Sequence, residues 1–365
     1  MTARTHDGWA ESLASCLNQG LAQGLHSACQ ACVIHRGRPA TLLALGESAP
    51  GIPLTPDSIL LWMSAGKPLL AAGLGLLWQD HLLGWDDPVV RYLPEFGTHG
   101  KESLTLRHLL DHTGGFRQAD PIRETSWPAQ VAAVCATRRE PQWVPGEKQG
   151  YHLGGSWTIL GAVLERITGE RLAPWLRRHL FEPLGMDSTW AGGLPAEAAT
   201  WPHGRLALMQ ESRNGHCRPH PFWSLEENLR ACWPGSNTLS TARDMARFYQ
   251  ALLEGGQGVL AEATVRELTT PTHPARFDAT FKRPMRFHLG FLFDAKQPGE
   301  AWHSYGYGAA AGPRTFGHGG NQSTTAFADP DRQLAVALAF NAMPGDLLHQ
   351  QRTRSALDAI APLES

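Results

Sequence analysis

LWMSAGKPLLAAGLGLLW (61–78) is an apolar, helix-like run that carries one serine, Ser64, and one lysine, Lys67. A spacing of three puts both side chains on one helix face, one turn apart. Serine needs a base to become a nucleophile, and a lysine enclosed by apolar residues is shifted toward the neutral form that can act as one. The run therefore predicts a helix from near Ser64 to 78–79 that carries a nucleophile and its base. The same spacing also fits an ordinary serine beside a lysine that reaches solvent.

The composition is that of a packed globular protein. Hydrophobic residues make up 42% and charged residues 18% of 365 residues, and 32 basic against 34 acidic side chains give a net charge of −2. Without a long basic run, binding of nucleic acid or of a membrane surface is not expected. The first residues have no continuous apolar segment typical of a secretory signal, so we expect a cytoplasmic protein.

Strand-like and helix-like patterns divide the chain into three parts. Period-2 or continuous apolar runs predict strands at 29–36, 40–45, 289–293, 315–317, 324–328 and 334–341. Helix-like stripes predict helices at 8–25, around 106–110, 157–167, 175–180 and 242–252, and at 346–361. We therefore predict an α/β (α+β) fold, with a sheet domain from 1–62 and 235–365, a helical domain inserted at 63–234, and the active site between them.

Two further segments carry side chains suited to chemistry. In PGEKQGYHL (145–153), Tyr151 lies near Lys148, and a phenol beside an ammonium group can act as a general base. In FGHGGN (316–321), glycines next to a strand pattern indicate close approach of a ligand to the backbone. Taken alone, Tyr151 also fits a structural role, and His318 also fits a solvated side chain at a bulge.

Together, these motifs and further blocks carry a resemblance over about residues 28–341. The sequence resembles the serine β-lactamase-like superfamily: class C β-lactamases, DD-peptidases and, most closely, family VIII carboxylesterases. The blocks that carry it, in the family's order, are SAGK (64–67), WDDPVVRYLPEF (85–96), LTLRHLLDHTGGF (104–116), PGEKQGYHLGGSWTILGAVLERITGE (145–170), FEPLGMDST (181–189), STARDMARF (240–248) and FGHGGNQSTTAFADP (316–330).

The resemblance implies a β-lactamase or penicillin-binding-protein fold, with an antiparallel sheet flanked by helices and an inserted helical domain. It implies that Ser64 is the acylated nucleophile, and that Lys67 and Tyr151 share the role of general base. The oxyanion hole would be the backbone N–H groups of Ser64 and Asn321. Substrate would contact four residues: His152, His318, Gly319 and Gly320.

Departures from the family pattern favour the esterase branch. The Tyr-x-Asn motif of β-lactamases and DD-peptidases is Tyr151-His152-Leu153 here, which removes the amide expected to bind a β-lactam or peptide. His318 stands where a lysine would bind a substrate carboxylate, and histidine is mostly neutral at pH 7. We expect a serine hydrolase that acts on a small ester or amide without a cofactor, in an oligomeric state that the sequence does not reveal.

Several alternatives stay open at this point. The enzyme could instead be an acyltransferase of a biosynthetic pathway, then a DD-peptidase or weak β-lactamase, then a non-catalytic binding scaffold. Cys29 and Cys32 have the spacing of a redox or zinc pair but lie in a strand pattern without a second ligand pair, which favours buried small side chains. His108 and His112 have helical metal-ligand spacing without a third ligand, so no metal site is expected.

Overall fold

The computed structural model describes residues 8–119, 121–124, 126–297 and 299–363. A nine-stranded sheet runs through it in the order β3-β2-β1-β13-β12-β11-β10-β9-β8, and every neighbouring pair is antiparallel. The strands are β1 (Ala28–His35), β2 (Arg38–Ala49), β3 (Ile52–Pro53), β8 (Arg276–Asp278), β9 (Arg283–His288), β10 (Phe291–Phe293), β11 (Phe316–Gly320), β12 (Thr324–Asp329) and β13 (Leu334–Phe340). The predicted antiparallel sheet built from both ends of the chain is confirmed.

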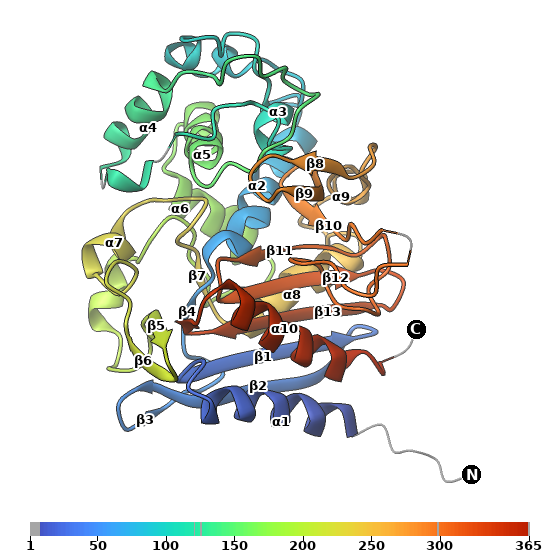
Figure 1. The fold of residues 1–365 in the computed structure, drawn as a ribbon. Coiled ribbons are helices and arrows are strands. Elements are labelled where there is room, and N and C mark those ends of the chain that lie inside the picture. The colour runs from blue at the N-terminus through green and yellow to red at the C-terminus, as the bar shows by residue number, and fades with distance from the viewer. Residues whose placement is uncertain (1–7, 120, 125, 298, 364–365) are drawn as a thin grey trace.

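The centre of the sheet joins the two ends of the chain. β1 pairs with β13 in a register that sets Cys32 opposite Ala337. All seven residues of β13 are buried, because helices cover both faces of the sheet. Helices α1 (Gly8–Ala22) and α10 (Asp346–Ile360) lie side by side on one face, and α8 (Ala242–Leu253) packs on the other (Figure 1).

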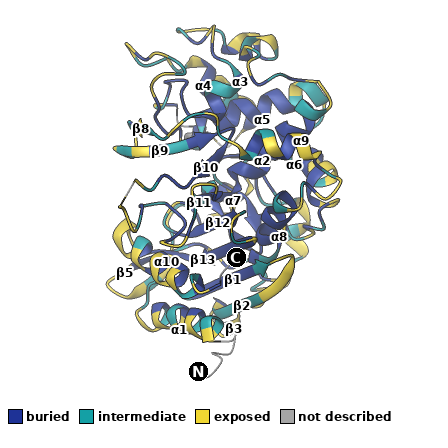
Figure 2. Cartoon of the chain, turned by 90° about the vertical axis from the view of Figure 1, so that its right-hand side faces the viewer, coloured by how far each residue is buried: buried dark blue, intermediate teal, exposed yellow. Residues whose placement is uncertain are grey.

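The remaining helices form most of the upper part of the molecule in Figure 1. They are α2 (Lys67–Gln79), α3 (Leu106–Leu110), α4 (Trp127–Ala136), α5 (Gly155–Thr168), α6 (Leu172–Leu176), α7 (Glu226–Arg230) and α9 (Glu262–Thr269). Figure 2 shows buried residues concentrated in α2, α5 and the central strands, and exposed ones on the outer sides of α1 and α10. The apolar stripes that predicted these helices thus face the core.

Several elements differ from the sequence-based expectation. Ser64 lies on a 3₁₀ turn, η1 (Met63–Gly66), and the α-helix begins only at Lys67. The predicted helical segment 63–234 contains a hairpin, β5 (Gln210–Arg213) and β6 (His216–Pro219), that pairs with β14 (Ala342–Met343). A further short pair, β4 (Leu60–Leu61) and β7 (Leu239–Ser240), flanks the segment. The domain boundaries at 62–63 and 234–235 stay a prediction.

The cysteine and histidine pairs noted in the sequence have structural positions. Cys29 and Cys32 are free and buried in β1, and burial raises the pKa of both thiols. α3 ends at Leu110, so His108 and His112 do not share a helix face, and His108 instead closes a capping box with Thr105. Among the described residues, no helix is both long enough and apolar enough to span a bilayer.

Candidate active site

Ser64 lies on η1, which is held in place by contacts to residues far along the chain. Trp62, just before the turn, donates its N–H to the carbonyl oxygen of Thr238 (2.8 Å), and its own carbonyl accepts from Thr324 Oγ1 (2.8 Å). Met63, which lies between Trp62 and Ser64, adopts φ +51°, a left-handed conformation that is uncommon for a non-glycine residue. Such local strain is typical of functional sites, where the surrounding structure holds it in place.

Lys67 is completely buried and directed at Ser64. Its Nζ lies 2.8 Å from Ser64 Oγ, 3.0 Å from the carbonyl oxygen of Leu153 and 2.6 Å from that of Gly235. Burial lowers the pKa of Lys67 well below its ordinary value, and no carboxylate among the described residues forms an ion pair with it. The three short contacts fix the amine while its environment favours the neutral form, which can accept the proton of Ser64.

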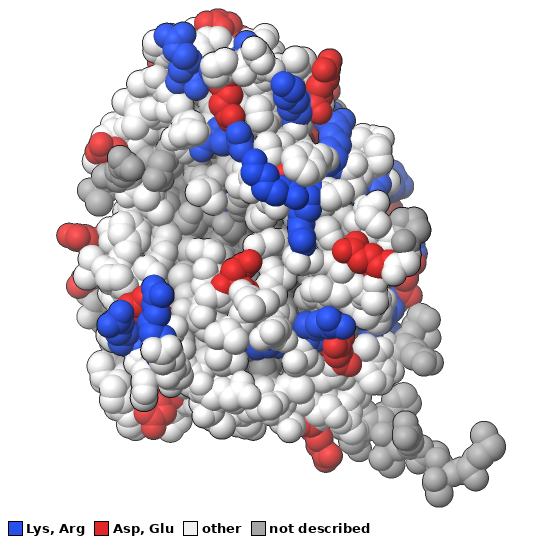
Figure 3. Space-filling view, in the orientation of Figure 1, with Lys and Arg blue, Asp and Glu red and all other residues white. Residues whose placement is uncertain are grey.

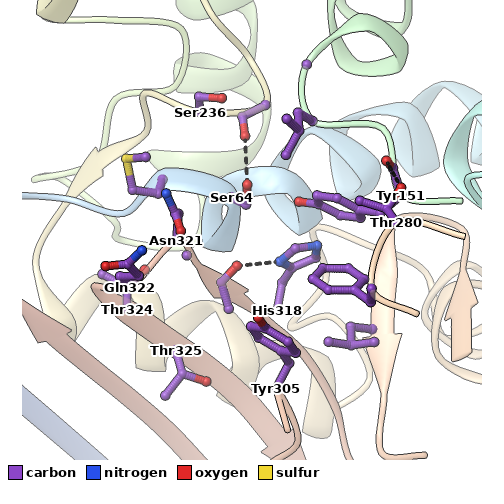
Figure 4. A pocket seen from close by; sticks show the side chains of 18 of the residues that line it. Ser64, Tyr151, Ser236, Thr280, Tyr305, His318, Asn321, Gln322, Thr324 and Thr325 are labelled. Carbon is purple, nitrogen blue, oxygen red and sulfur yellow. Dashed lines mark hydrogen bonds between the residues drawn. The ribbon is translucent and has the colours of Figure 1, made fainter. Parts of the chain in front are cut away.

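Tyr151 also approaches Ser64, from the loop between α4 and α5. In Figure 4 its hydroxyl and the side chain of Ser64 point toward one another. Burial raises the pKa of Tyr151 above its ordinary value, so the phenol is neutral at pH 7. Lys67 Nζ lies 5.2 Å from the centre of the Tyr151 ring. The structure therefore brings the three predicted side chains together around one serine hydroxyl.

A buried carboxylate positions the loop that carries Tyr151. Asp278, at the end of β8, accepts from the Tyr151 N–H (3.3 Å) and from the N–H groups of Thr280 (2.8 Å) and Phe281 (2.9 Å). Thr280 Oγ1 in turn donates to the carbonyl oxygen of Tyr151 (3.0 Å). Asp278 was not singled out in the sequence, because its partners lie 127 or more residues away in the chain, as the Tyr151 N–H and the Gln149 side chain do, or within its own turn.

The end of β11 forms the opposite wall. A Cβ at Gly320 would lie 2.1 Å from Thr324 Oγ1 and 2.5 Å from the Trp62 carbonyl oxygen, so only glycine allows the strand this close to η1. At Gly319 the nearest atom would be 3.6 Å away. Within the described part of the chain, the N–H groups of Ser64 and Asn321 have no hydrogen-bond acceptor. Both are free to donate to a substrate oxygen, as an oxyanion hole requires.

His318 contributes a neutral imidazole below Ser64 and Tyr151 (Figure 4). Its Nδ1 lies 2.7 Å from the Gly319 carbonyl oxygen, and a carbonyl can only accept, so Nδ1 carries the proton. Burial, with the charge of Lys67 second, lowers the pKa of His318 to about 3. The ring therefore offers no positive charge to a substrate carboxylate.

His152 lies behind the site rather than in it. Its Nε2 accepts from the Phe116 N–H (3.2 Å), and its backbone N–H donates to His112 Nδ1 (3.1 Å). It is not among the residues that line the cavity at Ser64, whereas its neighbours Tyr151 and Leu153 are. Substrate contact by His152 stays a prediction, and the position of its ring is that of a residue that supports the loop.

The cavity at Ser64 has a volume of about 430 Å³ and an uncharged lining. None of its described lining residues is Lys, Arg, Asp or Glu, and burial lowers the pKa of His349 as it does that of His318. Aromatic and aliphatic side chains dominate: Met63, Ile122, Leu153, Trp223, Trp233, Phe281, Phe287, Leu292, Trp302 and Tyr305. Figure 3 shows the same: the hollow in this face is mostly uncoloured, with charged groups at its rim.

Sequence comparison places this chain in a known family. A family model described as Beta-lactamase matches residues 13–361. The chain belongs to the beta-lactamase family. A curated relative, the esterase/beta-lactamase LipL of Mycobacterium tuberculosis, is 27% identical over 335 residues, which cover 83% of this chain and 73% of LipL. The match to another curated relative, from Escherichia coli, spans 62% of that relative, which is longer than this chain.

Solved structures of other proteins share the fold of this chain. A penicillin-binding protein homologue from Caulobacter crescentus superposes with a TM-score of 0.78 at 24% identity, covering 98% of this chain and 99% of that one. A family VIII carboxylesterase gives a TM-score of 0.75 at 23% identity, covering 98% of each chain. The predicted resemblance and the predicted fold class are thus confirmed.

Proposed function

We propose that the protein is a serine esterase that hydrolyses small, uncharged esters through an acyl-enzyme on Ser64. The uncharged lining of the cavity is the observation that carries this proposal. A carboxylate bound there would lose its hydration without gaining a cationic partner, which costs several kcal/mol. An ester with apolar groups on both sides of its carbonyl suits the same lining, and LipL, an esterase/beta-lactamase, is a relative of this chain.

In the proposed acylation step, Ser64 Oγ bonds to the ester carbonyl carbon while its proton passes to the neutral amine of Lys67. The backbone N–H groups of Ser64 and Asn321 donate to the oxygen that becomes negative. The bond to the alcohol then breaks, and the departing oxygen takes the proton of Tyr151, which is replaced from Lys67. Because Lys67 and Tyr151 exchange protons through the reaction centre, the two side chains titrate together as a pair.

Deacylation repeats these steps with water. The water oxygen bonds to the acyl carbon and gives a proton to the pair, the bond to Ser64 breaks, and Ser64 regains its proton as the carboxylic acid leaves. An alcohol or amine in place of water would make the enzyme an acyltransferase. A solved structure with the same fold, EstCE1, is described as a hydrolase with promiscuous acyltransferase activity. An acyltransferase with an alcohol or amine as acceptor is therefore the second candidate function.

The test compares two esters of similar size that differ in charge. We expect p-nitrophenyl butyrate to give a kcat/KM at least about 100-fold above that of the mono-p-nitrophenyl ester of succinate, since an unpaired buried charge costs about 3 kcal/mol or more. Ser64→Ala should abolish turnover and leave the circular dichroism spectrum unchanged.

Intact-mass measurement separates the outcomes. A butyryl adduct on the wild type that is absent in Ser64→Ala supports the acyl-enzyme, and clearance only on adding an alcohol or amine would indicate the acyltransferase. Equal rates on the two esters, or full activity of Ser64→Ala, would contradict the proposal.

A further inference from the structure

Three potential metal ligands from separate segments meet away from the Ser64 cavity. Asp111 follows α3, His273 lies in the link between α9 and β8, and His288 ends β9. One ligand atom from each lies within 4.8 Å of the other two. None of the three lines the cavity at Ser64. The cluster was not found in the sequence analysis, because its members are up to 177 residues apart.

Both imidazoles are oriented as metal ligands usually are. His288 Nε2 lies 2.9 Å from the Glu267 carbonyl oxygen, and His273 Nδ1 lies 3.0 Å from that of Pro274. Carbonyls only accept, so these nitrogens carry the protons and leave lone pairs on His288 Nδ1 and His273 Nε2. Both of those atoms are buried and, within the described residues, have no hydrogen-bond partner. Second-shell carbonyls fix the tautomers of metal-bound histidines in the same way.

Asp111 supplies a carboxyl oxygen as the third donor atom. Its side chain is 6% exposed, and its Oδ1 accepts from the Leu289 N–H at 2.6 Å. Two arginines act on it electrostatically, but Arg107 is bound to Asp86 (2.8 Å), and Arg276 donates to the Gly146 carbonyl oxygen. Neither forms an ion pair with Asp111 among the described residues, so the carboxylate remains available to a cation.

We propose that Asp111, His273 and His288 form a binding site for a divalent transition-metal ion, with zinc(II) the best match to two nitrogens and one oxygen. Three protein ligands leave a fourth position for water. Tetrahedral bonds of about 2.0–2.2 Å put ligand atoms roughly 3.4 Å apart, so the side chains must close by about 1 Å. His273 is partly exposed and gives the ion a route in from solvent.

A metal here would tie together three segments behind the active site. Asp111 is followed directly by His112, whose ring lies 4.5 Å from that of Tyr151. Leu289, which binds Asp111, leads into β10 of the sheet. The ion would thus join the α3 region to the sheet edge without touching the reacting atoms, which is the position of a structural rather than a catalytic metal.

The test uses the full-length protein after dialysis against a chelator. Zinc should rebind at one ion per chain by elemental analysis, and cobalt(II) should give the visible absorption of a tetrahedral site with histidine ligands. At zinc concentrations 100-fold above Kd we expect Tm to rise by about 3–4 °C. His273→Gln, at the partly exposed position, should abolish all three signals, and His216→Gln, an exposed histidine on β6, should keep them.

Asp111→Asn provides a second ligand variant, and it is scored by metal content rather than by stability alone. Loss of zinc from a folded Asp111→Asn protein supports the site. A wild type that retains no zinc and gives no cobalt spectrum overturns it. So does equal metal content in wild type and His273→Gln.

Discussion

Lys67 and Lys101 are both buried, and their partners give them different roles. Lys101 Nζ donates to the carbonyl oxygens of Thr98 (3.0 Å) and Cys135 (2.9 Å), near the C-terminal end of α4, where a positive charge is favourable. Lys67 also has carbonyl partners, but its third partner is the hydroxyl of Ser64. A buried lysine is therefore a candidate base only where one of its contacts is a group that can give up a proton.

The backbone of Gly235 helps to hold Lys67 in place. Its carbonyl accepts from Lys67, and a Cβ at this position would lie 3.2 Å from Lys67 Nζ and 3.1 Å from the Trp157 Cβ. We expect Gly235→Ala to fold but to lower kcat by about 10- to 100-fold, because small displacements of a reacting group are costly. Ester hydrolysis by purified protein measures this. Gly8→Ala, where nothing lies within 4 Å of the new Cβ, is the matched control, and wild-type kcat in Gly235→Ala would refute the expectation.

At the scale of elements, α10 supports the loop after β11 through one buried arginine. Arg352 donates to the carbonyl oxygens of Leu25 (2.7 Å), Gln322 (2.8 Å) and Ala342 (2.7 Å). Burial lowers the pKa of Arg352 to about 9. Gln322 is next to Asn321, so this arginine positions one side of the proposed oxyanion hole.

Arg352→Met should leave these carbonyls without a donor and lower the free energy of unfolding by about 3 kcal/mol, at 1–3 kcal/mol for each buried group left unpaired. Arg354→Met, two residues along α10 at an exposed position, should change it by less than about 0.5 kcal/mol. Urea denaturation measures both, and equal effects would show that Arg352 has no special role.

The predictability of the elements follows from how local their causes are. The helix predicted at 242–252 is present, and the Thr241 side chain just before it accepts from the Asp244 N–H (3.1 Å). The helix predicted at 157–167 is also present, and Gly169 after it has the left-handed φ of +72°. The hairpin β5–β6 was missed although its turn leaves a local signal: Asn214 and Gly215, both with positive φ, form the Asn-Gly pair that tight hairpins favour. Only its pairing with β14 depends on residues more than 120 positions away. Likewise Ser64, Lys67 and Tyr151 stood out as motif residues, whereas Gly235 and Asp278 act through backbone contacts that leave no local pattern.

At the scale of the whole molecule, buried neutral histidines make the fold sensitive to acid. Burial is the main cause that lowers the pKa of His26, His152 and His318 to about 3. Below pH 6.5 the unfolded chain binds protons that the folded chain does not, so stability falls as pH decreases toward 3. Burial raises the pKa of Asp244 and Asp329, and these two work in the opposite direction, with stability gained as they bind protons.

We expect the free energy of unfolding to fall between pH 6.5 and 4, with each such histidine contributing up to about 1.4 kcal/mol per pH unit. His26→Gln, which removes one of these groups away from the active site, should flatten the slope by about that amount. Denaturation at several pH values measures it, with exposed His216→Gln as the control. An unchanged slope in His26→Gln would contradict the assignment.

The pairing of β1 with β13 also sets the order in which the molecule can be completed. During synthesis β1 leaves the ribosome almost 300 residues before its partner strand β13 does. Until then the edge of β1 has no neighbour, although the helices between them can already form. The position of Ser64 on η1 also depends on residues that are made late, because Thr324 of β12 donates to the Trp62 carbonyl oxygen beside it. A nascent chain therefore carries Ser64, Lys67 and Tyr151, until Thr324 is made, without the frame that makes them a site.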